Sequence, residues 1–191
     1  DMYHVYTVDE HTVFAVGILS GIENGKFGDE LPLATELSGN LLSREVLYLA
    51  LFLHDIGKGR GGNHSIIGAR IARKLGPRLG LSGGDTETVA WLVEHHLLLS
   101  NTAFKRDIGD PQTVQDFVAV IQSLERLRLL LVLTVADIRA VGPRVWNGWK
   151  GIGDKTSIVA NCATIPHDPS EIKSRLASDK SIPYDWNIKH K

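Results

Sequence analysis

The chain has 191 residues, a formal net charge of −1 and 43% hydrophobic residues, a composition typical of a globular protein with one substantial core. The near-neutral charge argues against a general binder of nucleic acid or membrane surfaces, and no apolar run is long enough to span a bilayer. The single cysteine, Cys162, excludes an internal disulfide framework, and the start lacks a signal peptide. We therefore expect a cytoplasmic protein.

The first two helices are predicted on either side of a glycine-rich segment. The first begins near Thr7, because Thr7 and Glu10 have the spacing of a capping box. Residues 21–39 are rich in glycine and are predicted to form a long loop. The second helix runs from about residue 40 or 43 to residue 56, and we place it at the centre of the domain because it is apolar on nearly every side.

Four more helices follow, and residues at their starts favour capping: Asn63 before the third, Asp110-Pro111 at the fifth and Ser123 before the sixth. They are predicted over about residues 64–75, 86–97, 111–122 and 124–141, with a polar connection at residues 100–110. The fold class is therefore all-α, with about six core helices.

The sequence changes in character after Trp149. Residues 1–150 are predicted to be one domain, and residues 151–191 an irregular tail with three prolines and one short helix near residues 170–177. The tail is interpreted as a divergent or non-native end. Because the sequence starts at Asp1 and not at methionine, we expect an excerpt of a longer protein.

The second helix ends in His54 and Asp55. An ionised carboxylate that is buried costs several kcal/mol unless it is paired or binds a metal. An imidazole beside a carboxylate offers two metal ligands at one place. Further candidate ligands occur on the other helices: His11, His64, His95, His96 and Asp137. Each of these alone is more often an ordinary surface or hydrogen-bonded residue, and Asp137 has Arg128 and Arg139 as possible partners.

Taken together, these residues resemble the ligand pattern of the HD-domain superfamily of metal-dependent phosphohydrolases. The resemblance implies an HD-domain helical bundle in which His11, His54, Asp55 and Asp137 hold one divalent ion. It also implies that His64, with His95 or His96, holds a second ion in binuclear members, with Asp55 as the bridge. Oxygen and imidazole ligands without thiolate favour Mn, Mg, Fe or Co.

This resemblance implies hydrolysis by a metal-activated water, with Asp55 at its centre. Lys58 would contact a phosphoryl oxygen or assist the leaving group, although a solvated loop lysine is an equal alternative. Weaker candidates for phosphate binding, for which a surface role is favoured, are Arg60, Lys105, Arg106 and Arg139.

Three segments, residues 3–12, 51–65 and 131–149, resemble more closely the HD domain of the bifunctional uridylyltransferase/uridylyl-removing enzymes of bacterial nitrogen signalling. The resemblance covers residues 1–150 and implies hydrolysis of the bond between UMP and a tyrosine of the PII signal protein. In keeping with the near-neutral charge, no nucleic-acid or membrane partner is expected. The family's nucleotidyltransferase and ACT domains have no counterpart in these residues, so we expect neither transferase activity nor a glutamine sensor in them.

Two alternatives remain open from the sequence. The first is an HD hydrolase of a small nucleotide or alarmone, in which residues 21–39 form one wall of a small-molecule pocket. The second is a non-catalytic helical regulatory module whose histidines and aspartates bind a structural metal or none.

Overall fold

The computed structural model describes residues 6–107, 110–142 and 145–146. Over these ranges the chain forms α-helices, one short 3₁₀ helix and no strand, which confirms the all-α class. The helices are α1 Val8–Glu23, α2 Pro32–Ser38, α3 Arg44–Leu53, α4 His64–Leu75, η1 Gly76–Leu79, α5 Gly83–His95, α6 Leu98–Lys105, α7 Pro111–Ile121 and α8 Leu124–Val141. None of them is long and apolar enough to cross a membrane. The predicted tail, with its helix near residues 170–177, lies outside the described residues.

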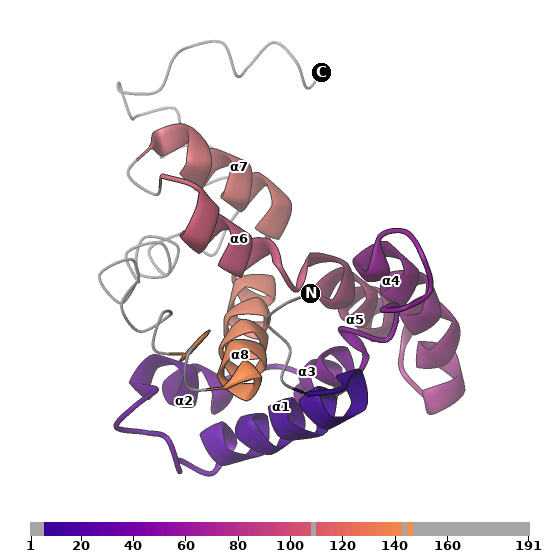
Figure 1. Ribbon diagram of the computed structural model, residues 1–191, viewed down its shortest axis with the longest axis horizontal. Helices are drawn as coiled ribbons and strands as arrows, with labels where there is room; N and C mark the ends of the chain where they lie inside the picture. Colours follow the sequence, from indigo (N-terminus) through magenta and orange to yellow (C-terminus); the bar gives the residue numbers. More distant parts are fainter. Residues whose placement is uncertain (1–5, 108–109, 143–144, 147–191) are drawn as a thin grey trace.

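Helix α8 lies at the centre of the bundle, with α1, α2, α3, α5, α6 and α7 packed against it (Figure 1). Its side chains are buried on nearly every side, as in a helix that is apolar all round. The sequence predicts this central position for a different helix, the one that ends in His54. That helix, α3, is only partly buried. The side chain of Phe52, near its end, is 56% exposed.

The predicted helix starts are confirmed where a polar side chain caps the helix. The Glu10 carboxylate accepts hydrogen bonds from the backbone N–H and the hydroxyl of Thr7, at 3.0 Å each. Asn63 Oδ1 accepts from the backbone N–H groups of Ser65 and Ile66, so α4 begins at His64. Asp110 caps α7 in the same manner. These caps satisfy donors that a helix leaves unpaired at its first turn.

Replacing Asn63 with alanine should lower the free energy of unfolding by about 1 kcal/mol, because two backbone donors lose their acceptor. Urea denaturation followed by circular dichroism would measure the change. Asn63→Asp retains an acceptor and should stay within a few tenths of a kcal/mol of the unchanged protein. Equal losses in both variants would contradict the capping role.

Two segments that the sequence predicts to be irregular contain helices. Residues 21–39 include the last turn of α1 and all of α2, which begins at Pro32 and packs on α8 and α1. Phe27 lies against Gly21 and beneath the guanidinium of Arg139, 4.5 Å from the ring centre. The predicted polar connection at residues 100–110 includes most of α6. Contacts with the rest of the bundle stabilise both helices despite their weak local signals.

Helices α4 and α5 pack closely because glycines lie between them. A Cβ on Gly68 would come within 2.8 Å of Val93 Cγ1, and one on Gly76 would overlap Thr86. Small residues at a helix contact let two backbones approach. The close pair brings His64, at the start of α4, beside His96, directly after α5.

Candidate metal centre

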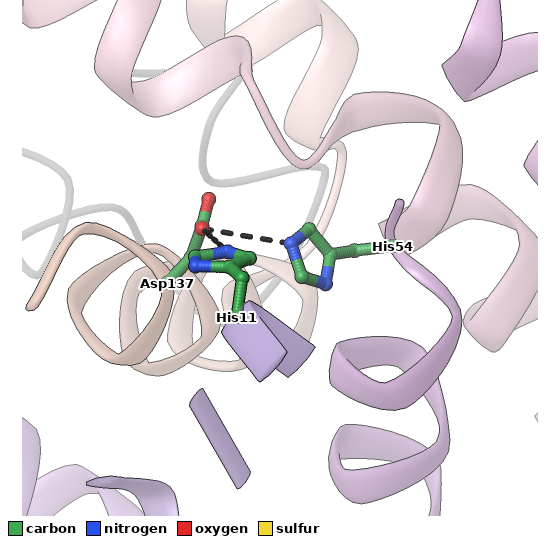
Figure 2. A group of neighbouring side chains, drawn as sticks. All are labelled: His11, His54 and Asp137. Atoms are coloured by element: carbon green, nitrogen blue, oxygen red, sulfur yellow. Dashed lines mark hydrogen bonds and ion pairs between the residues drawn. The ribbon is translucent and has the colours of Figure 1, made fainter. Parts of the chain in front are cut away.

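The first group of candidate ligands comes from three helices that are far apart in the sequence. His11 lies on α1, His54 directly follows α3, and Asp137 lies on α8 (Figure 2). His11 Nε2 is 2.8 Å from Asp137 Oδ1, and His54 Nε2 is 3.5 Å from the same oxygen. The three ligand atoms lie within 4.8 Å of one another, and both histidines are buried. The packing of α1 and α3 on α8 therefore assembles this group.

A second group lies next to the first and consists of Asp55, His64 and His96. Asp55 Oδ1 is 3.7 Å from His64 Nε2 and 3.8 Å from His96 Nε2. The other oxygen of Asp55, Oδ2, is 3.4 Å from His54 Nε2. The Asp55 carboxylate thus has one oxygen toward each group, and its side chain is only 3% exposed.

Backbone hydrogen bonds fix the orientation of two histidine rings. His54 Nδ1 donates to the carbonyl of Leu51 at 2.6 Å, and His96 Nδ1 donates to the carbonyl of Val93 at 2.8 Å. With Nδ1 as donor, the Nε2 atom of the neutral ring carries the lone pair that binds a metal. Within the described residues, His54 Nε2 is buried without a hydrogen bond. Buried imidazole and carboxylate donors at this spacing fit a divalent cation.

The pKa of His54 is shifted in the opposite direction to the pKa values of His64 and His96. Burial by itself lowers the pKa of His54, but the carboxylates of Asp137 and Asp55 outweigh it and raise the pKa to about 10. Burial, with the charge of His54 nearby, lowers the pKa of His96 to about 4. Burial also lowers the pKa of His64. The shifts thus favour neutral imidazoles in the second group, whereas they favour the protonated form of His54.

The apparent affinity for a divalent ion should rise with pH between about 6.5 and 8.5. A metal binds only the neutral imidazole, and His54, with its pKa raised to about 10, must lose a proton over this whole range. Each released proton adds up to about one logarithmic unit of affinity per pH unit. Isothermal titration calorimetry with Mn²⁺, in two buffers of different ionisation enthalpy, would count the protons. Affinity that is independent of pH would contradict this assignment.

The structure brings together six of the seven predicted metal ligands. His95 belongs to neither group: its ring packs on Trp91 at 4.9 Å between centroids. Lys58 lies beside the centre, with Nζ 2.6 Å from Asp55 Oδ2.

The weaker phosphate candidates have other surroundings. Arg139 pairs with Glu30, Arg106 pairs with Asp116, and Lys105 is exposed. Arg60 is exposed and donates to the Ile56 carbonyl. These surroundings fit the surface or structural roles favoured from the sequence.

Gly57 has a role in the site that the sequence does not predict. A Cβ at Gly57 would lie 2.1 Å from the carbonyl oxygen of His64 and 3.0 Å from the backbone nitrogen of Gly68. The backbone of the His54–Asp55 turn thus lies directly against the start of α4. The glycine after the His54–Asp55 pair predicts a turn, but the local sequence does not predict that this turn lies against the backbone of α4.

A comparison with protein families identifies the class to which the chain belongs. The family model described as "HD domain" matches residues 8–141, so the chain belongs to the HD domain family, a class of metal-dependent phosphohydrolases.

Particular relatives within that family carry one shared name, bifunctional uridylyltransferase/uridylyl-removing enzyme. The chain is 68% identical to the one from Azospirillum brasilense and 63% identical to the one from Novosphingobium aromaticivorans. Each match covers 150 residues, or 78% of this chain and 16% of the relative. The relative from Erythrobacter litoralis is 58% identical over 182 residues, or 94% of this chain and 20% of the relative. The chain thus spans about a fifth or less of the length of these relatives.

Proposed function

We propose that this chain is a metal-dependent phosphodiesterase that removes uridylyl groups from the uridylylated PII signal protein and releases UMP. The observation that carries the proposal is the pair of ligand groups joined by His54 and Asp55. The uridylyl-removing name of relatives at 58–68% identity supports the choice of substrate. We further propose that residues 1–150 form the hydrolase domain.

The donor set supports two divalent ions, one for each group, with Asp55 as the shared ligand. His11, His54 and Asp137 would hold the first ion, and His64 and His96 the second. Imidazole and carboxylate ligands without cysteine favour Mn, Mg or Fe. His95 is left out of this proposal because its ring packs on Trp91.

The residues around the centre support hydrolysis by water without a protein nucleophile. Divalent ions held there would supply an acidified water and neutralise charge on phosphoryl oxygens. Asp55 and Asp137 would provide the negative charge that holds the cations in this largely buried place. The Lys58 ammonium, 23% exposed, is close enough to the centre to bind a phosphoryl oxygen or the departing tyrosinate oxygen.

The test is UMP release from uridylylated PII by the purified chain with Mn²⁺. We expect release that stops when EDTA is added and resumes with excess Mn²⁺. Free nucleotides should be turned over far more slowly than modified PII under the same conditions. Turnover of free nucleotides without UMP release from PII would instead favour a small-molecule hydrolase. Absence of any Mn²⁺-dependent hydrolysis would overturn the enzymatic assignment.

A further inference from the structure

The Asp55 carboxylate forms an ion pair with a side chain of the same protein, Lys58. Lys58 Nζ lies 2.6 Å from Asp55 Oδ2, the oxygen that also faces His54 Nε2 at 3.4 Å. Asp55 is almost fully buried, whereas the Lys58 side chain is 23% exposed. A short contact between an ammonium and a buried carboxylate is a strong charge-assisted hydrogen bond. Lys58 therefore binds the ligand oxygen that lies nearest to the first group.

We propose that Lys58 competes with divalent ions for Asp55 and thereby sets how tightly the centre binds them. This inference rests on the metal dependence proposed above. An ammonium on a ligand oxygen makes that oxygen a weaker donor and repels a second cation nearby. In the metal-free protein the same ammonium compensates a buried carboxylate, which would otherwise be costly. Both effects favour the metal-free state and weaken metal binding.

This competition would let Lys58 contact two anions in turn, first the Asp55 carboxylate and then the phosphodiester of the substrate. An ion held by Asp55 would compensate the carboxylate charge, and the Lys58 ammonium would then be free to leave Oδ2. Its partial exposure gives the released head group access to an anion from outside the protein. The phosphodiester of the substrate is such an anion, and it arrives at the same centre. Lys58 is thus a positioning residue for Asp55 before metal binding and a substrate contact after it.

Mn²⁺ titrations of the full chain by calorimetry would test this inference. Lys58→Met should bind Mn²⁺ about tenfold more tightly or better, because the competing cation is gone. Lys58→Arg keeps a cation beside Asp55 and should bind with nearly unchanged affinity. Arg60→Met removes a positive charge from the same loop, but Arg60 donates to the Ile56 carbonyl, at 3.2 Å, and not to a ligand of the centre. Its Mn²⁺ affinity should change less than twofold.

The unfolding temperature provides a second readout, which does not require a measurement of Mn²⁺ affinity. Metal-free Lys58→Met should unfold at a lower temperature than the unchanged chain, and Mn²⁺ should raise its unfolding temperature by a larger increment. If this variant does not fold without metal, Lys58→Gln takes its place with the same expected tightening. Equal or weaker Mn²⁺ binding by these variants would overturn the inference while leaving the metal centre intact. Absence of Mn²⁺ binding by the unchanged chain would overturn the centre and the inference together.

Discussion

Replacing Asp55 with alanine should reduce hydrolysis by about a thousandfold or more, because this carboxylate faces both ligand groups. Loss of Asp55 removes a member of the second group and the oxygen that faces the first group, and it leaves His54 and Lys58 without their shared anion. The measurement is the rate of UMP release from uridylylated PII at saturating Mn²⁺. Calorimetry on the same variant should show weakened Mn²⁺ binding.

Two further variants separate the loss of a ligand from the loss of the fold. Asp55→Asn keeps the size of the side chain and removes its charge, and it should be about as inactive as alanine. Asp29→Ala removes a carboxylate that is exposed and should retain full activity. Circular dichroism should show the helical content of all three variants to be similar. Substantial UMP release by Asp55→Ala would contradict the proposed chemistry.

Replacing Gly57 with alanine should destabilise the protein by about 3 kcal/mol, because the new Cβ has no space. The contact at 2.1 Å is with the carbonyl oxygen of His64, which belongs to the backbone of α4 and cannot rotate away. Relief requires α4 to move from the His54–Asp55 turn, and His64 would move with it. We therefore expect lost stability and weaker binding of the second ion. Urea denaturation and Mn²⁺ titration would measure the two effects.

Gly17 provides the matched control for this substitution. It lies in the middle of α1, is exposed, and a Cβ added there would have no atom within 4 Å. Alanine there should stabilise the protein by roughly 0.5–1 kcal/mol, because alanine favours the helix and glycine does not. If Gly17→Ala destabilised the protein as much as Gly57→Ala does, the loss of stability in Gly57→Ala would not be due to a local clash.

The sequence by itself determined the class of fold and most of the candidate ligands. Helix starts are encoded locally, since Asn63 and Asp110 cap helices through hydrogen bonds within three residues of themselves. The His54–Asp55 pair is conspicuous because charged groups at the end of an apolar helix are costly without a partner. Asp137 is recognisable for the same reason, because it directly follows the largely apolar run at residues 129–136.

Only the tertiary structure decided how these residues combine. His95 and His96 are neighbours in the sequence, but consecutive helical residues differ by about 100° in direction, so only His96 faces the centre. The first group forms where α1 and α3 pack on α8, whereas His64 and His96 meet Oδ1 of Asp55 because α4 packs on α5. The need for glycine at position 57 arises from a backbone contact with His64 across a turn. Contacts of this kind join residues through space, so local patterns of the sequence do not encode them.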